Sequence, residues 1–463
     1  MSEIEEVRYS KSTHVSYGIG GFLDNFFIAA FTVRIIDFYE NELLLGIIYV
    51  GIAFVIFGFW NMVNDPILGW LSDRKTRFTK RWGRRFPWFA IGALSYAWIY
   101  LLIFTVPFTD QIGMFIWLVI MICIFELLFS LWQINYLSLF PDKFRSDKER
   151  TSVGAWNTVW GLIGIVLGVM IPPLIITYGD ISSYITAGII VTLLGFILAI
   201  FSLPGMKEDE ELKERQLKLL EKAETKESFW VIMKRAVTDK NFMAYVLTYM
   251  GHLVMTTMML ASLPYWNKYI VGSDNPDNEI IMSAGFLVAV LLSVPLWSYI
   301  GRKYGNRNAF LMGTLSTTLL FIPLFFVSDI ISTTVVIGLI GVGIGAIWVL
   351  MYPCFSDVID DIVIKTDKRQ EGAYTGIRTF FGRFSIVIQA LAFAIVHPLT
   401  GYIAGAPPGQ NSQTPLAEFG IRILMAGFPM LFYFIGFLLI WRVYTLDQAC
   451  VAENKELLQQ KLL

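Results

Sequence analysis

The sequence predicts an all-α membrane protein with twelve transmembrane helices, arranged as two halves of six helices each. Three observations support this fold class. Hydrophobic residues make up 56% of the 463 residues and charged residues only 16%, whereas a soluble domain usually carries about 25% charge. Apolar runs of about 20 residues recur along the chain, each long enough to cross a hydrocarbon core of about 30 Å as a helix. One densely charged stretch near the middle separates these runs into two sets.

The apolar runs should be helices because backbone polar groups in lipid must be satisfied within their own segment. The expected spans of the first half are 15–38, 43–71, 86–107, 113–140, 151–175 and 182–203. Those of the second half are 237–268, 280–300, 307–327, 331–354, 372–396 and 418–444. The charged stretch 204–235 cannot cross a membrane and reads as a solvated, helical linker. The predicted domains are therefore a bundle over 1–203, this linker, and a second bundle over 236–463 with a short tail.

The loops of the two halves echo each other and carry an uneven charge. The loop sequence GWLSDRK over 69–75 is matched by WSYIGRK over 297–303, which suggests parallel repeats. Lysine and arginine gather in every second loop, and the alternate loops are nearly free of them. Cytoplasmic loops carry the positive excess. We therefore expect a protein of the cell membrane whose two termini and linker are cytoplasmic.

Several functional classes are disfavoured by what the sequence lacks. The three cysteines form neither a close pair nor a metal-ligand spacing, so no disulfide framework and no metal site are expected. The chain has no phosphate-binding loop, nucleophile elbow or metal-binding histidine pair. We therefore expect neither an enzyme nor a cofactor.

Ionisable residues inside the apolar runs carry the strongest functional signal, because a charge in the bilayer is costly and tends to face a cavity or a partner. Asn61 and Asp65 are four residues apart on the second helix and share a face. Their oxygens suit a hard cation such as Na⁺, or the carboxylate can accept a proton. Alternatively, Asp65 caps the helix or pairs with the arginines that follow it.

Two more helices of the first half carry polar side chains. Glu126, Ser130 and Gln133 lie on one stripe of the fourth helix, because their spacings are four and three. This stripe either lines a cavity or joins helices through a polar network. Asp24 and Asn25 on the first helix are expected to face a central site.

The second half offers two ionisable candidates. Arg383 lies about three turns into the eleventh helix, so an acidic partner is expected, and Asp65, Glu126 or Asp24 would serve. His252 on the seventh helix either titrates near neutral pH or is a hydrogen-bonded packing residue.

The chain resembles the glycoside–pentoside–hexuronide:cation symporters of the major facilitator superfamily in two motifs, NDPILGWLSDR over 64–74 and WGRRFPW over 82–88. Two further stretches agree, 135–151 after the fourth helix and 357–376 before the eleventh. The resemblance covers the whole chain. It implies two six-helix bundles with a central cavity, alternating access, and uptake of a small solute with Na⁺, H⁺ or Li⁺.

The resemblance also assigns cation-binding residues. Asp65 matches the second of two family acids on the second helix, and Asn61 stands where the first would be. Asn64 and Ser130 match positions that contribute polar groups near the cation. Arg383 falls where the family usually has a lysine, and we expect it to couple the two bundles. The missing acid shifts the expectation towards H⁺ or a weaker Na⁺ site.

The solute positions depart further from the family. The family acid of the first helix falls on Asn25, that of the fourth helix on Gln133, and an arginine of the fifth helix on Thr158. These departures do not match a galactoside site. Asp24 and Glu126 are candidates to supply the missing charge.

The resulting hypothesis is a cation-coupled symporter of a small solute, a sugar or glycoside. The main alternative is a lysolipid or other amphiphile symporter on the same fold, because a related branch of the family transports lysophospholipids. A non-transporting sensor and a membrane-embedded enzyme are weaker rivals. The expected partners are the solute, the cation and the lipid bilayer, with no nucleic acid, and the protein is expected to be a monomer.

Overall fold

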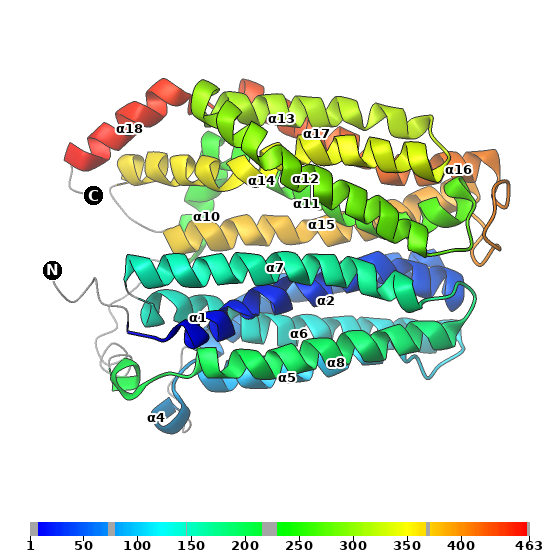
Figure 1. The fold of residues 1–463 in the computed structure, drawn as a ribbon, viewed down its shortest axis with the longest axis horizontal. Helices are drawn as coiled ribbons and strands as arrows, with labels where there is room; N and C mark the ends of the chain where they lie inside the picture. The colour runs from blue at the N-terminus through cyan, green and yellow to red at the C-terminus, as the bar shows by residue number, and fades with distance from the viewer. Residues whose placement is uncertain (1–7, 73–78, 145, 215–228, 367–370, 461–463) are drawn as a thin grey trace. The chain divides into compact units, whose positions relative to one another are not determined.

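The computed structural model describes residues 8–72, 79–144, 146–214, 229–366 and 371–460. All regular elements within these ranges are helices, and twelve helices are long and apolar enough to cross a membrane (Figure 1). This confirms the predicted fold class. The chain divides into two compact units, Met1–Thr225 and Lys226–Leu463, so the division falls inside the charged stretch 204–235.

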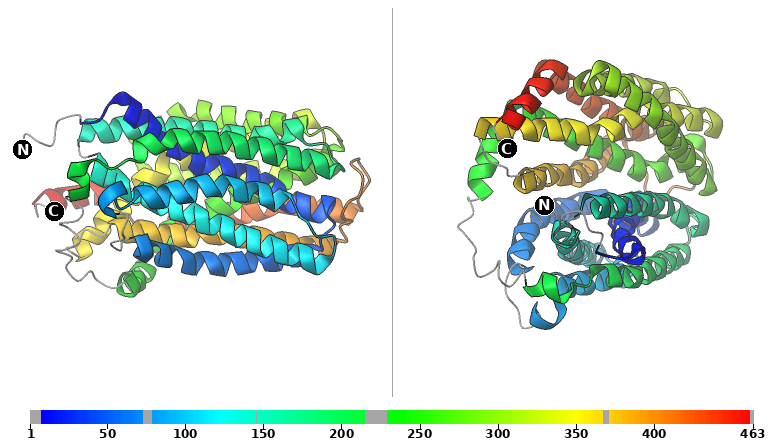
Figure 2. Two further views of the ribbon diagram at one scale, coloured as in Figure 1. Left: turned by 90° about the horizontal axis from the view of Figure 1, so that it is seen from below. Right: turned by 60° about the vertical axis from the view of Figure 1, so that its left-hand side comes forward.

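Unit 1 contains the first six spans, and its helices run alongside one another as a bundle (Figure 2). The first span is broken into consecutive segments and ends in a π-helical turn. The elements of unit 1 are α1 (Lys11–Gly18), α2 (Gly20–Asp37), η2 (Phe38–Glu42), α3 (Ile47–Ser72), α4 (Thr79–Trp82), α5 (Phe86–Phe104), α6 (Gln111–Lys143), α7 (Asp147–Ile175) and α8 (Ile181–Met206).

Unit 2 contains the other six spans and two helices outside them. The seventh span ends in the π-helical turn η3, and another such turn, η5, interrupts the twelfth. The elements of unit 2 are α10 (Phe229–Thr238), α11 (Lys240–Tyr265), η3 (Trp266–Val271), α12 (Asp277–Tyr304), α13 (Asn306–Leu320), η4 (Ile322–Phe325), α14 (Ile330–Thr366), α15 (Glu371–Thr400), α16 (Pro415–Arg422), η5 (Ile423–Gly427), α17 (Phe428–Arg442) and α18 (Gln448–Gln460).

Side-chain caps explain where several helices begin. Asp110 accepts a hydrogen bond from the backbone N–H of Gly113 at the start of α6 (2.7 Å), and Ser146 does the same for Glu149 at the start of α7 (3.2 Å). Asp239 caps α11 in the same way. Each cap satisfies a backbone donor that the first turn of a helix leaves unpaired.

The first helix packs unusually close to α6 and α7. A Cβ atom on Gly20 would lie 2.3 Å from the ring of Tyr136, and one on Gly21 would lie 2.3 Å from the backbone oxygen of Asn157. Neither distance is possible for a real side chain, so the backbone can approach only because these residues are glycines. The close approach brings Asp24 and Asn25, one turn further along α2, towards α6 and α7.

The tenth span is longer than predicted, since α14 continues to Thr366 instead of ending near residue 354. Its last turns are polar, yet their side chains are paired. The Asp361 carboxylate accepts hydrogen bonds from Asn241 Nδ2 (3.1 Å) and Lys365 Nζ (2.6 Å). The C-terminal tail contains the helix α18. Residues 215–228 of the linker lie outside the described part of the chain.

Candidate functional site

The polar residues of α3 share one face, opposite an apolar face. Asn61 and Asn64 are buried, with 4% and 2% of their surfaces exposed, and Asp65 is half-buried. Phe59 and Val63 are exposed on the opposite side, as expected of side chains that face lipid. The amides and the carboxylate therefore point into the bundle, as the spacing of Asn61 and Asp65 predicted.

The polar face of α3 meets α6 at Glu126. Asn64 Nδ2 donates a hydrogen bond to the backbone oxygen of Glu126 (3.4 Å), and Ser130 Oγ donates to Glu126 Oε1 (3.3 Å). Glu126 and Ser130 are both buried. We call Asn61, Asn64, Asp65, Glu126 and Ser130 the α3–α6 cluster, which offers amide, hydroxyl and carboxylate oxygens.

A second polar group lies further along α6 and includes α2. Gln133 Nε2 donates a hydrogen bond of 2.5 Å to Asp24 Oδ1, and both side chains are half-buried. Asn25 is half-buried too, and its Nδ2 donates to the backbone oxygen of Gly21 (2.9 Å). We call Asp24, Asn25 and Gln133 the α2–α6 cluster. Glu126 belongs to the other group, although sequence reasoning placed it beside the solute.

Tyr136 on α6 and Asn157 on α7, which sequence reasoning missed, extend the α2–α6 cluster to a third helix. Asn157 Nδ2 donates a hydrogen bond of 2.5 Å to the hydroxyl of Tyr136, and that hydroxyl donates to the backbone oxygen of Tyr17 (3.1 Å). Asn157 is half-buried and beside Gly21. A signal was available in the sequence, because an amide inside an apolar run is costly unless it has a partner.

Thr158 was predicted to contact solute, and it lies next to Asn157 on α7. Its side chain is exposed, and its hydroxyl donates to the backbone oxygen of Gly154 on the same helix (3.0 Å). Arg383 is half-buried on α15 of unit 2, and its pairing with an acid of the first half stays a prediction. Among the described residues, no three His, Cys, Asp or Glu side chains form a metal-binding group.

The Glu208 carboxylate holds the motif WGRRFPW at one end of unit 1 through hydrogen bonds. Glu208, which follows α8, is 6% exposed and accepts hydrogen bonds from the backbone N–H groups of Arg84 (3.1 Å), Arg85 (2.6 Å) and Phe86 (3.0 Å). These donors precede or begin α5, so Glu208 caps that helix. Residues 73–78, which include the last two residues of the motif over 64–74, lie outside the described residues.

The N-terminal segment joins the same end. The backbone N–H groups of Arg8 and Tyr9 donate to Glu149 Oε1 at 2.8 Å each, and the Tyr9 hydroxyl donates to Asp209 Oδ2 at 2.6 Å. Arg8 pairs with Glu211. Burial, and then the hydrogen bond to Asp209, raises the pKa of Tyr9. For Asp209, burial opposes ionisation, but the hydrogen bonds from Tyr9 and the Leu212 backbone outweigh it and lower the pKa.

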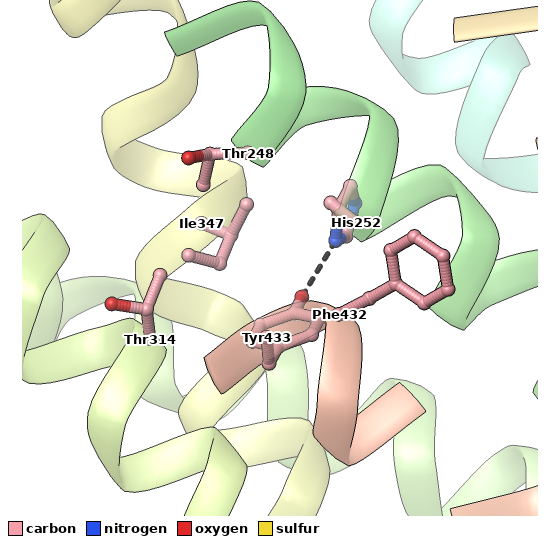
Figure 3. A pocket seen from close by; sticks show the side chains of 6 residues that line it. All are labelled: Thr248, His252, Thr314, Ile347, Phe432 and Tyr433. Carbon is pink, nitrogen blue, oxygen red and sulfur yellow. Dashed lines mark hydrogen bonds between the residues drawn. The ribbon is translucent and has the colours of Figure 1, made fainter. Parts of the chain in front are cut away.

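His252 forms a separate contact in unit 2. Its Nδ1 lies 2.7 Å from the hydroxyl of Tyr433 on α17 (Figure 3). The space around this pair is too narrow to admit a water molecule, and its other lining residues are Thr248, Thr314, Ile347 and Phe432. This geometry favours the packing interpretation of His252.

The comparison with known families decides the broad class of the protein. The family model described as "MFS/sugar transport protein" matches residues 16–448, nearly the whole chain. The chain belongs to this family. It is therefore a multi-pass membrane protein of the major facilitator superfamily, a superfamily of transporters. The narrower resemblance to glycoside–pentoside–hexuronide symporters stays a prediction.

Curated relatives match along most of their length. The chain is 22% identical to a sodium-dependent lysophosphatidylcholine symporter 1-B of Danio rerio, over 98% of this chain and 90% of the relative. It is 22% identical to the human sodium-dependent lysophosphatidylcholine symporter 1, over 89% of this chain and 78% of the relative. It is 24% identical to the uncharacterized symporter YjmB of Bacillus subtilis, over 98% and 97%.

Solved structures share the fold. The nucleoside transporter NupG matches with a TM-score of 0.63 at 14% identity, over 93% of this chain and 99% of that one. A D-xylose-proton symporter matches with a TM-score of 0.65 at 13% identity, over 94% and 98%. These likenesses support the major facilitator fold.

Proposed function

We propose that this protein is a secondary active transporter that couples uptake of a small solute to a cation, with both ligands held by unit 1. One observation carries the proposal. The single helix α6 contributes Glu126 and Ser130 to the α3–α6 cluster and Gln133 to the α2–α6 cluster. Two polar groups, one turn apart inside a membrane-spanning helix, can bind two ligands, and binding of one can change the affinity for the other.

The α3–α6 cluster binds the cation in this proposal, and the cation is Na⁺. Hard cations prefer oxygen ligands. Asp65 supplies charge, and Asn61, Asn64 and Ser130 supply neutral oxygens. Asn64 uses its nitrogen on the Glu126 backbone, which leaves its oxygen for a ligand. Glu126 supplies the second negative charge, in place of the family acid whose position Asn61 occupies. Sodium dependence of the curated lysophosphatidylcholine symporters agrees with this choice.

The α2–α6 cluster binds the solute, and a sugar or glycoside suits it best. Asp24, Asn25, Gln133 and Asn157 present carboxylate and amide groups, which pair with hydroxyl groups as both donors and acceptors. Thr158, beside Asn157, is exposed enough to contribute a contact. The family description as sugar transport proteins supports the same class.

A lysophospholipid is the second candidate solute, because six curated relatives that match this chain are named sodium-dependent lysophosphatidylcholine symporters.

The proposal also places both termini of the protein in the cytoplasm. Arg81, Arg84 and Arg85 lie at the end of unit 1 that holds the N-terminal segment, which fits the excess of basic residues in cytoplasmic loops.

The test is gradient-driven uptake by purified protein in proteoliposomes, with methyl-β-glucoside and lysophosphatidylcholine as labelled probes. An inward Na⁺ gradient should stimulate uptake of one of the two. Asp65→Asn should lower that stimulated uptake about tenfold or more, since a lost charge-assisted ligand contributes about 1.5–3 kcal/mol. The control is Asp274→Asn, which removes an exposed acid of unit 2. Full stimulated uptake by Asp65→Asn contradicts the assigned cation site, and stimulation by a pH gradient alone contradicts Na⁺.

A further inference from the structure

Tyr96 on α5 is a buried donor that the two polar clusters do not account for. The residue is 0% exposed, and within the described residues its hydroxyl has no hydrogen-bond partner. A buried hydroxyl without a partner is destabilising, so such groups are uncommon in folded proteins unless they serve a function.

Aromatic neighbours fix the position of the Tyr96 ring. It stacks on Phe125 with ring centroids 4.3 Å apart, and it meets Phe27 edge-on at 4.9 Å. Phe125 immediately precedes Glu126 on α6, and Phe27 lies one turn after Asp24 on α2. The ring therefore sits where the backbones that carry these two carboxylates come together.

These two neighbours place the Tyr96 ring beside both clusters. Phe125 is adjacent in the chain to Glu126 of the α3–α6 cluster, and Phe27 is one helical turn from Asp24 of the α2–α6 cluster. The phenol therefore lies between the segments of α6 and α2 that carry the two proposed ligand sites. A neutral phenol has a single O–H to donate, which it can give to one carboxylate at a time.

We propose that Tyr96 is a positioning residue that relays between the cation and solute sites, an inference that rests on the proposed function. Without the cation, the Tyr96 hydroxyl donates to Glu126 through one water molecule. A cation at the α3–α6 cluster takes over the charge of Glu126, and the hydroxyl then donates to Asp24. Asp24 is in this way oriented for solute only after the cation has bound.

A double-mutant cycle on Na⁺ affinity tests the relay without requiring the solute. The variants are Asp24→Asn, Tyr96→Phe and the two combined, and the readout is the Na⁺ dependence of thermal unfolding of the full-length protein. Asp24→Asn should weaken the apparent Na⁺ affinity about fivefold, because the hydroxyl then stays on Glu126 in preference to the amide. In the combined variant, the same Asp24→Asn change should have almost no effect.

Tyr100→Phe provides the matched control. Tyr100 lies one turn further along α5, is also buried, and lines a space that includes Arg34. Asp24→Asn should keep its full effect on Na⁺ affinity when Tyr100 is replaced. An equal effect of Asp24→Asn with and without the Tyr96 hydroxyl overturns the relay.

Failure of the proposed function gives a different result. If Na⁺ does not stabilise the wild-type protein at all, the Na⁺ site is wrong. The same four proteins are then compared through the Li⁺ dependence of thermal unfolding. An effect of Asp24→Asn on Li⁺ affinity that requires the Tyr96 hydroxyl supports the relay, independent effects overturn it, and a protein that Li⁺ does not stabilise either overturns the relay together with the cation site.

Discussion

Gln133 and Asp24 are joined by a hydrogen bond of 2.5 Å, although they lie 109 residues apart in the chain. One turn earlier on the same helix, Ser130 donates instead to Glu126. Helix α6 therefore presents two differently connected polar groups. If the groups bind different ligands, variants one turn apart should affect different ligands.

Gln133→Leu and Ser130→Ala form the first pair of tests. At saturating Na⁺, Gln133→Leu should weaken binding of the transported probe about tenfold, because it removes a hydrogen bond to a charged group. Ser130→Ala should weaken Na⁺ binding about fivefold to tenfold, because it removes one oxygen ligand. Ligand-dependent shifts of the melting temperature measure both affinities. If both variants weaken binding of the same ligand, the two clusters do not have separate roles.

Glu208 offers a test of stability at the end of unit 1. Glu208→Ala removes a buried acceptor of three backbone N–H groups and should lower the free energy of unfolding by about 1–2 kcal/mol, as loss of a helix cap does. Glu210→Ala is the control, since the Glu210 side chain is 83% exposed. Thermal unfolding followed by tryptophan fluorescence gives the comparison. Equal melting temperatures for the two variants would count against the cap.

Tyr9 predicts a dependence of stability on alkaline pH. Its pKa is raised in the folded protein above the ordinary value of 10.0, so the folded state favours the neutral phenol. The stabilisation is complete below pH 10 and is lost as pH rises towards the folded-state pKa. Melting temperatures from pH 8 to 11 should fall less steeply for Tyr9→Phe than for the wild type. Parallel curves for the two proteins would show that Tyr9 does not contribute to the loss.

The membrane-spanning architecture follows from local sequence. Twelve apolar runs and the motifs over 64–74 and 82–88 are short-range features, and they predicted the helices and the superfamily. Lipid requires each span to satisfy its own backbone, so length and hydropathy are enough to predict a helix. Asn61 and Asp65 were also predicted to share a face, because residues four apart lie on the same side of a helix.

Tertiary structure decided which polar groups meet. Glu126 could have joined either cluster. Its carboxylate accepts from Ser130 of α6, and Asn64 of α3 donates to its backbone oxygen, so α3 packs on α6 at this residue. The sequence signals that Asn157 needs a partner but does not name it, and packing sets Asn157 against Tyr136 and Tyr96 against Phe125. The physical reason is that a helix periodicity specifies a face but not the neighbour that the face meets. That neighbour depends on close approaches between distant helices, such as the one that Gly20 and Gly21 permit.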